Sequence, residues 1–376
     1  MSICAERQLF GRSDTNKERR LFLSIVIAIL VFGLIVVIHE LGHYYMARKC
    51  GVFVEEFAVG MGPILFSRKK NETLYSLRLF PIGGFCKMLG EDSESGDARA
   101  LNNKTIGQRA LILSFGAILN IFLAFIIILF LVTANGFQSA SILKVVPDTP
   151  IDKAGLKAGD RIIRLNGATI NIFDDLALEL SLCNGNAMEI SYIRDGQKYK
   201  TEITPYKSPE GDYKLGFYPE AKTGIFTARV QGYERASILE SLSVPVYQIM
   251  FYIKATVVSI VKLITMQLPM EVISGPIGIV TVIDTTYKES IKEESGIWYT
   301  FLIMINLCAV LSANLGVFNL LPVPALDGGR LMFVLFELIR KKPVPVEKEG
   351  MVHFIGFLLL MIFAVFIAYS DIKKLL

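Results

Sequence analysis

Long apolar runs separated by polar segments dominate the chain. In the first run, 21–38, Ser24 is the only residue with a hydrogen-bonding side chain. About 20 helical residues cross a bilayer core of roughly 30 Å. The first run is too long for the apolar core of a signal peptide, and bulky residues follow it, so we expect it to be retained. The runs and their flanks predict four transmembrane helices, at 21–47, 106–134, 298–321 and 350–371.

A fifth apolar stretch, 236–268, is interrupted by polar positions. Glu240, Lys254 and Lys262 fall within it, together with Pro245. A helix of this kind is typical of the membrane interface. We therefore predict an amphipathic interfacial helix here rather than a span.

A segment with a strand-like pattern, 138–222, follows the second predicted span. Asp195-Gly196 separates two alternating runs, 188–193 and 199–203, which predicts a β-hairpin. The run AGLKAGDRIIRLNG at 154–167 resembles the core signature of bacterial PDZ domains, and a helical pattern follows it. The resemblance implies a mixed, mainly β domain that binds an extended peptide at a sheet edge. A PDZ domain that serves only as a spacer is the alternative.

The segment 48–105 also reads as strands, in its middle at 56–59 and 73–80. Glycines and prolines bound these strands, as in hairpins or where two backbones approach closely. We predict a β-loop associated with the membrane.

Composition agrees with a membrane protein, with 52% hydrophobic and 20% charged residues. The net charge of +4 is too small to indicate a nucleic-acid partner, and no basic patch with aromatic residues accompanies it. The five cysteines are scattered without a CxxC pair, so neither a disulfide scaffold nor a thiolate metal site is indicated.

Basic residues in short loops predict the orientation in the membrane. The 47–104 loop holds nine Lys and Arg residues, and the segment between the last two runs holds five. Both are expected in the cytoplasm, which places the 138–222 insert outside. The N-terminal extension, 1–20, also holds five basic residues and would lie outside, against the rule. The two loops together hold more basic residues than the extension, so we keep the orientation that they predict.

The motif His39-Glu40-Leu41-Gly42-His43 stands at the end of the first apolar run. Histidines four residues apart share one face of a helix, so both imidazoles reach one metal. Between them, Glu40 can take a proton from the water that the metal activates and pass it to the leaving amine. Zinc is the expected metal, because two imidazoles, a carboxylate and a water suit its catalytic sites. Ionisable residues in a span are functional sites by default.

The third ligand must lie elsewhere in the chain. The metzincin motif would continue with glycine and histidine, where this chain has Met46 and Lys49. A glutamate on a soluble helix, as in gluzincins, does not suit a motif that follows eighteen apolar residues. Asp327, in the NLLPVPALDGG segment at 319–329, is the carboxylate expected at membrane depth, because broken helices are tolerated there where they line a cavity. Glu337, near the basic end of the segment 322–340, is the weaker candidate.

Together these features resemble the site-2 protease family, peptidase family M50, in its bacterial RseP-type form. They are HExxH in the first helix, NxxPxPxLDG in the third and a PDZ insert between the second and third. The resemblance extends from about residue 21 to the C-terminus. It implies one zinc ion per chain, held by His39, His43 and Asp327, with Glu40 as the base.

The resemblance also implies roles in substrate binding. Asn319 and Asn314 would lie near the active site and bind the substrate backbone or the oxyanion. A membrane-dipping β-loop would pair with unwound substrate, and the stretch 274–278 would precede the third span. Some proteobacterial members carry two PDZ domains, whereas this sequence has one. The β-loop residues implied in substrate binding are Gly60, Gly62, Gly83 and Gly84.

The expected fold is a polytopic α-helical membrane protein with four transmembrane helices, an inserted PDZ domain and a membrane-associated β-loop. The expected location is the bacterial cytoplasmic (inner) membrane. The expected reaction is cleavage of transmembrane segments of single-pass proteins, such as anti-sigma factors or remnant signal peptides. An edge strand within 73–80 would hold the unwound segment.

The expected depth follows from helix geometry. At about 1.5 Å per residue, His39 lies about 27 Å along the first span, near the cytoplasmic face. The alternatives are a non-catalytic membrane PDZ scaffold with a vestigial metal site, and an anchored protease that cuts soluble peptides.

Overall fold

The computed structural model describes residues 3–91, 94–209, 211–227, 233–267, 275–292 and 296–375. Ser274 of the stretch expected before the third span and Leu268 of the expected interfacial helix lie outside the described residues, as do the first two residues of the N-terminal extension. The chain divides into two compact units. The first comprises Met1–Ala124 and Ser259–Leu376, and the second comprises Phe125–Val258.

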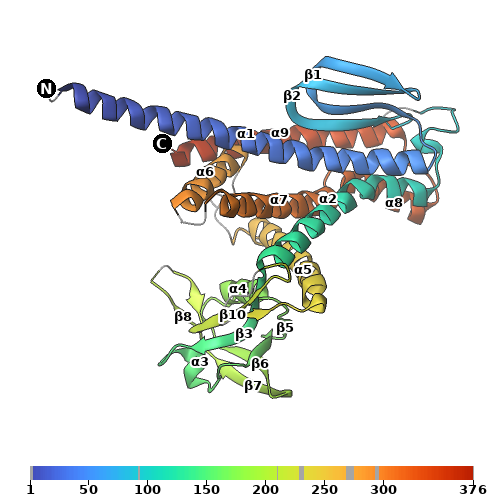
Figure 1. Cartoon of the computed structure of the whole chain (residues 1–376). Coiled ribbons are helices and arrows are strands. Elements are labelled where there is room, and N and C mark those ends of the chain that lie inside the picture. The colour runs from blue at the N-terminus through green and yellow to red at the C-terminus, as the bar shows by residue number, and fades with distance from the viewer. Residues whose placement is uncertain are drawn as a thin grey trace. The chain divides into compact units, whose positions relative to one another are not determined.

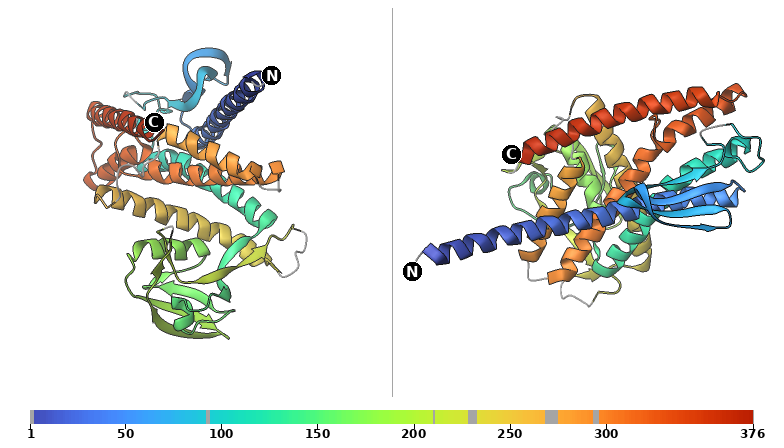
Figure 2. Two further views of the ribbon diagram at one scale, coloured as in Figure 1. Left: turned by 90° about the vertical axis from the view of Figure 1, so that its left-hand side faces the viewer. Right: turned by 90° about the horizontal axis from the view of Figure 1, so that it is seen from above.

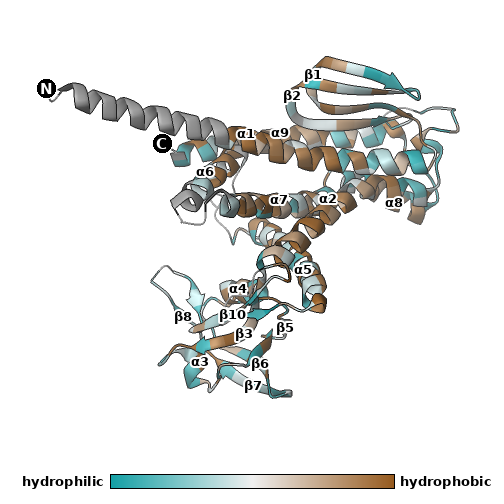
Figure 3. Cartoon of the chain, viewed as in Figure 1, coloured by the Kyte–Doolittle hydropathy of each residue, from teal (hydrophilic) through white to brown (hydrophobic). Residues whose placement is uncertain are grey.

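Helices make up most of the first unit (Figure 1). Their apolar residues extend along α1, α2, α7 and α9, as the brown segments of Figure 3 show. The helix α2 begins in this unit and continues into the second. The bounds are α1 Ile3–Lys49, α2 Ile106–Asn135, α6 Pro276–Lys292, α7 Gly296–Leu320, α8 Asp327–Arg340 and α9 Val346–Leu375.

Five described helices are long and apolar enough to cross a membrane. Four of these spans coincide with the predicted runs: Ser24–Lys49, Ile106–Asn135, Trp298–Leu320 and Val346–Lys374. The fifth is α5, Ile238–Ile264, in the stretch predicted to lie at the interface. Length and composition alone therefore do not separate α5 from the other four.

The segment after α1 forms a curled sheet from two long strands, β1 (Val54–Lys70) and β2 (Thr73–Met88). The first part of β1, from Val54 to Val59, lies opposite Gly84–Met88 on one side and opposite Leu74–Leu77 on the other. The second part of β1 pairs with Thr73–Arg78. The prediction of a substrate-binding edge within 73–80 is therefore wrong for its main part, because Leu74–Leu77 has partners on both sides.

One edge of this sheet is the last part of β2, Gly84–Met88, which runs along α1 (Figures 1 and 2), and the opposite edge is the second part of β1. Gly33 of α1 faces Pro81, and Val36 and Glu40 face Gly84. The seven residues from Gly33 to Glu40 rise about 10.5 Å along the helix, and the three residues from Pro81 to Gly84 span about 10 Å along the strand. The strand and the helix can therefore keep contact over this length. The edge thereby reaches the motif His39–His43.

The second unit contains a sheet in the order β11-β10-β3-β4-β6-β7, with β5 paired to β4. The predicted hairpin is confirmed, since Arg194 of β6 pairs with Gln197 of β7 around Asp195-Gly196. A separate small sheet contains β8 and β9. The element bounds are β3 Phe137–Val145, α3 Pro150–Lys153, β4 Arg161–Leu165, β5 Ala168–Thr169, α4 Phe173–Leu182, β6 Met188–Arg194, β7 Gln197–Ile203, β8 Tyr206–Lys207, β9 Tyr213–Lys214, β10 Phe217–Thr223 and β11 Glu234–Arg235.

Two features of the second unit bear on function. A groove of about 820 Å³ lies between α4 and the start of β10, lined by Leu176 and Leu180 on one side and Leu215–Phe217 on the other. The middle of α5 contacts α4 through polar pairs. Gln248 donates to Asp174 at 2.7 Å, and Lys254 lies 2.6 Å from Glu179.

Candidate metal centre

Three predicted ligands from α1 and α8 meet at one point in the first unit. His39 and His43 occupy the buried face of α1, which also carries Ile35, Gly42 and Met46. Their Nε2 atoms lie 3.2 Å apart. Asp327, the first residue of α8, places its Oδ2 atom 3.0 Å from His39 Nε2 and 3.1 Å from His43 Nε2.

The spacing of these three atoms fits a zinc ion. Ligand atoms about 2.0–2.1 Å from a tetrahedral zinc ion lie about 3.3 Å from one another. Among the described residues, this is the group of three metal-binding side chains whose ligand atoms converge. The residues present therefore fit the metal in number, type and spacing.

The protonation of His43 supports the same conclusion. Its Nδ1 atom lies 2.9 Å from the backbone carbonyl oxygen of Ile112 on α2. A carbonyl only accepts, so Nδ1 carries a proton, and Nε2 is the ring atom that faces His39 and Asp327. In the neutral ring Nε2 offers a lone pair to a metal, and the hydrogen bond from Nδ1 fixes the orientation of the ring, as is usual for histidines that bind metals.

Asn120 of α2 supports His39 in a similar way. The Nδ2 atom of Asn120 lies 3.4 Å from His39 Nδ1. Its Oδ1 atom is buried and has no hydrogen-bond partner among the described residues. A half turn of the amide lets Oδ1 accept the proton of His39 Nδ1, which satisfies both groups and leaves His39 Nε2 free for metal. Ser312 of α7 in turn donates to the backbone carbonyl of Asn120 at 2.8 Å.

Two glycines allow α1 and α2 to approach closely enough for these contacts. A Cβ atom at Gly42 would stand 2.5 Å from the carbonyl oxygen of Phe115. A Cβ atom at Gly116 would overlap His43 Nε2 and stand 2.8 Å from His39 Cε1. Small residues at helix crossings are the usual means of close approach in membranes. Here they bring the α2 backbone within reach of the imidazoles.

The turn before α8 delivers Asp327. It is closed by backbone hydrogen bonds, among them Leu326 N–H to Val323 at 3.2 Å. A Cβ atom at Gly329 would stand 2.5 Å from the Val323 carbonyl oxygen, and one at Gly328 would overlap Leu321. The two glycines of the LDGG motif therefore let the first turn of α8 pack onto the turn that precedes it.

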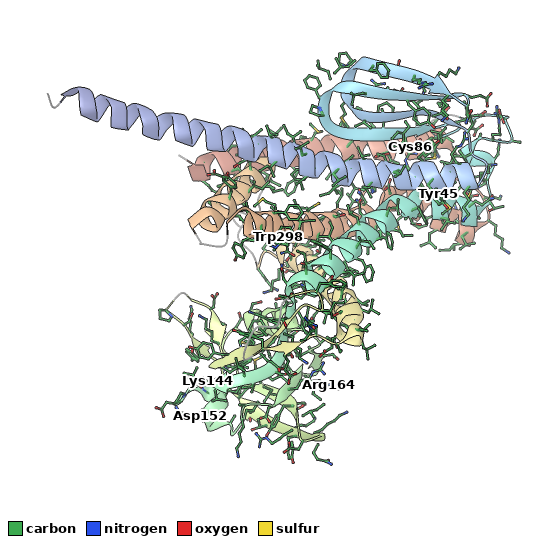
Figure 4. The ribbon with its side chains drawn as sticks, viewed as in Figure 1. Tyr45, Cys86, Lys144, Asp152, Arg164 and Trp298 are labelled. Atoms are coloured by element: carbon green, nitrogen blue, oxygen red, sulfur yellow. The ribbon has the colours of Figure 1, made fainter. Side chains whose placement is uncertain are left out.

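Glu40, which lies between the two histidines in the sequence, adjoins the edge of the sheet formed by the last part of β2. Its Cγ atom is 3.6 Å from the position that a Cβ at Gly84 would occupy. Cys86, two residues further along β2, is buried (Figure 4). Burial, with the nearby carboxylates of Glu40 and Glu91, raises the pKa of the Cys86 thiol. Cys86 is not among the described side chains whose ligand atoms converge with those of His39 and His43.

The other predicted substrate-binding residues are placed differently. Ser312 and Gly316 lie on the face of α7 that packs against α2. Asn319 comes seven residues after Ser312 and three after Gly316, so it shares that face. Asn314 is two residues from Gly316, about 200° around the helix, and so lies on another face. In the sheet, Gly84 adjoins Glu40, whereas the other three glycines pack within the sheet. Gly60 faces the Phe80 backbone, Gly62 the Phe80 ring and Gly83 the Met61 side chain.

The alternative ligand Glu337 is engaged elsewhere. Its Oε1 atom lies 2.6 Å from Arg109 Nη2 in an ion pair.

The sequence analysis did not identify Asn120 and Gly116 as functional residues. The pattern that could have indicated them is a small residue and a polar residue one helical turn apart within a mainly apolar run.

The chain is similar to known proteins over most of its length. The model of peptidase family M50 matches residues 27–363. A candidate zinc metalloprotease of Clostridium acetobutylicum is 35% identical over 352 residues, with 93% of this chain and 98% of that protein covered. Zinc metalloprotease RasP of Geobacillus kaustophilus is 31% identical over 432 residues, covering 93% and 98%.

Solved structures resemble a part of the chain. A PDZ domain of an SdrC-like protein from Listeria monocytogenes matches 22% of this chain and 88% of its own, with 18% identity and a TM-score of 0.20. Its counterpart from Listeria innocua covers 22% and 92%, with 19% identity and a TM-score of 0.20. Such scores do not decide the fold of the insert. The match to the family model over most of the length does decide the family: the chain belongs to peptidase family M50, the site-2 protease family of zinc metalloproteases.

Proposed function

We propose that this multi-pass membrane protein is an intramembrane zinc metalloprotease that cleaves transmembrane segments of single-pass proteins. The observation that carries the proposal is the position of the complete site. His39, Glu40 and His43 lie within the span Ser24–Lys49, and Asp327 converges on them directly after the span that ends at Leu320. The peptide bond to be cut must therefore reach membrane depth.

The residues divide the chemistry among themselves. His39, His43 and Asp327 would hold the zinc ion, which supplies Lewis-acid activation of water and of the scissile carbonyl. Glu40 accepts the proton of the attacking water and returns it to the leaving amine. Asn319 donates to the oxyanion or to the substrate backbone, in keeping with its face of α7.

The free edge of β2 is the proposed place for the substrate backbone. A helix hides its peptide bonds in its own hydrogen bonds, so the substrate must unwind before water attacks. Among the described residues, the last part of β2, Gly84–Met88, has a partner strand on one side only, and its first residue, Gly84, adjoins Glu40. Strand addition there would hold an extended substrate beside the base.

For α5 we infer an interfacial position rather than a span. Gln248 and Lys254 lie near the middle of α5 and contact the acidic side chains of Asp174 and Glu179 on α4. If α5 crossed the membrane, these four polar groups would lie near the bilayer midplane, at high cost. An interfacial α5 keeps them in or near water.

This arrangement leaves four spans. The basic loops then favour a site near the cytoplasmic face, with the insert 138–222 outside the bacterial cytoplasmic membrane.

The groove between α4 and β10 is the proposed peptide site of a PDZ domain. β10 pairs with β3 on one side, and on the other with β11 at Lys222 and Thr223 only. Among the described residues, the part of β10 from Phe217 to Ala221 therefore has a free edge beside α4. An extended segment of the substrate outside the membrane would bind there by strand addition.

The decisive experiment uses the full-length chain in proteoliposomes. The probes are two single-pass model substrates that differ in the transmembrane helix alone, one uniform in leucine and one with a central Asn-Gly pair that eases unwinding. We expect the second to be cut at least tenfold faster. Glu40→Gln should keep one zinc ion per chain and lose about 10²–10⁴-fold in rate. Asp327→Asn should bind zinc more weakly, and the exposed Glu347→Gln is the matched control.

Two results would contradict the proposal. Cleavage by Glu40→Gln within a few-fold of wild type would favour the alternative of a non-catalytic PDZ scaffold with a vestigial metal site. Efficient cleavage of a soluble peptide carrying the same sequence, with neither membrane substrate cut, would instead indicate an anchored protease of soluble peptides.

A further inference from the structure

The third histidine of the chain, His353 on α9, contacts the turn that carries Asp327. Its Nδ1 atom accepts a hydrogen bond from the backbone N–H of Ala325 at 2.9 Å. Its ring lies against Phe333 of α8, with ring centroids 5.7 Å apart. Because Nδ1 accepts, the neutral imidazole carries its proton on Nε2. One side chain of α9 thus contacts both the turn and α8.

The residue that His353 holds has an unusual backbone. Ala325 has a φ of +75°, in the left-handed region that alanine rarely adopts. For a residue other than glycine this conformation is unfavourable, and it persists only where the surroundings fix it. Ala325 is two residues from Asp327, so a change of its backbone would move the carboxylate directly.

A second contact from α9 fixes the same turn. Gly356, one turn further along the helix, packs against Pro324, and a Cβ atom there would stand 2.8 Å from the Pro324 carbonyl carbon. The turn is closed from its other side by Gly329, whose N–H donates to Leu326 at 3.0 Å. Ala325 is therefore held between α9 and the start of α8.

We propose that His353 is a positioning residue of the metal centre. Its hydrogen bond to Ala325 holds the turn 322–326 in the conformation that brings Asp327 Oδ2 to His39 and His43. It touches neither metal nor substrate. The inference rests on the zinc site of the proposed function, but not on which substrate is cut.

The test separates the hydrogen-bond acceptor from the ring. His353→Phe keeps an aromatic ring against Phe333 and removes the acceptor. His353→Asn places an amide oxygen close to where Nδ1 stands, and His353→Gln moves the acceptor further out. Phe354→Leu, at a neighbouring exposed position on the same helix, is the matched control.

The main readout is the rate at which zinc-loaded, full-length protein in detergent loses zinc to a chromogenic chelator. Loss of a group that orients a ligand commonly weakens metal binding about 10–100-fold. We expect His353→Phe and His353→Gln to lose zinc at least tenfold faster than wild type. His353→Asn should stay within about threefold of wild type, and Phe354→Leu should be unchanged.

A double variant tests whether the effect passes through Ala325. Glycine adopts the left-handed conformation without strain. Ala325→Gly should therefore recover part of the zinc retention lost in His353→Phe, while having little effect in the wild-type background. Independent, additive effects of the two substitutions would contradict the proposed route.

Other outcomes also decide the matter. Wild-type zinc retention in His353→Phe would overturn the proposal. Equal loss in His353→Phe and His353→Asn would do so as well, because an acceptor restored at the position of Nδ1 would then give no protection. If the zinc results are as expected and no variant, wild type included, cuts a membrane substrate, the proposed function fails and the positioning role stands.

Discussion

At the scale of single residues, the metal centre depends on the absence of side chains as much as on their presence. Gly42 and Gly116 leave the space in which His43 reaches the Ile112 carbonyl and His39 reaches Asn120. Their effect can be compared with helix propensity, which favours alanine over glycine by about 1 kcal/mol within a helix. For Gly116→Ala, helix propensity therefore predicts a more stable helix, whereas packing predicts that the site is disrupted.

Gly116→Ala is expected to remove zinc binding, because the new Cβ would overlap His43 Nε2. The matched control is Gly107→Ala on the same helix, where a Cβ would meet nothing within 4 Å. We expect the control to bind zinc normally and to unfold at an equal or higher temperature. Metal analysis of the two purified proteins checks the prediction, and full zinc occupancy in Gly116→Ala would refute it.

The sequence predicted the residues whose relation is local. His39, Glu40 and His43 lie within one helical turn of one another, and Asp327 followed because few carboxylates are at membrane depth. Asn120 and His353 were not predicted, because their partners are 81 and 28 residues away along the chain. Contacts of that range depend on how the helices cross, which spacing does not encode.

At the scale of elements, the sheet shows what the alternation of apolar and polar residues does not predict. The pattern predicted strands in the segment 48–105, but it does not record which strand lies beside which. The structure has Leu74–Leu77 between two neighbours, which leaves Gly84–Met88 at one edge and the second part of β1 at the other. Part of this arrangement is fixed by Glu56, which accepts from Ser76 at 2.5 Å and from Arg78 at 2.6 Å.

The Glu56 cluster predicts a pH dependence of the sheet. Burial alone would raise the pKa of Glu56, but the hydrogen bonds from Ser76 and Arg78 outweigh it and lower the pKa below its ordinary value. A lowered folded-state pKa adds stability that is present above the unfolded pKa and is lost as pH falls through the folded pKa. Thermal unfolding of the full chain in detergent between pH 7 and pH 3 should therefore show a loss that Glu56→Gln reduces. The exposed Glu72→Gln should retain the wild-type slope, and an unchanged slope in Glu56→Gln would exclude the cluster as the cause.

At the scale of the whole molecule, the number of spans determines where the two ends of the chain lie. Run length predicted four of the five described helices that are long and apolar enough to cross a membrane, because length and apolarity are what a bilayer requires. It could not assign α5, whose length also suffices. The contacts of α5 with Asp174 and Glu179 are what favour the interface, and they exist only in the folded unit.

Four spans place both ends on one side of the membrane, whereas five place them on opposite sides. With the 47–104 loop in the cytoplasm, we expect alkaline phosphatase fused after Leu376 to be active and a green fluorescent protein there to be dark. The reverse is expected for the same reporters inserted near Gly96. An insertion between Asp195 and Gly196 serves as the external control. A cytoplasmic C-terminus together with a cytoplasmic Gly96 would show that α5 crosses the membrane.

The wide separation of the ligands along the chain also has a consequence for biosynthesis. His43 and Asp327 are 284 residues apart. At about 5–20 residues per second, a ribosome needs roughly a quarter of a minute to a minute to add the carboxylate after the histidine pair. During that interval the nascent chain has the two imidazoles but not the carboxylate that converges with them in the folded protein. The proposed metal centre therefore cannot form until Asp327 has been synthesised, and the histidine pair is made well before it can take part in any reaction there.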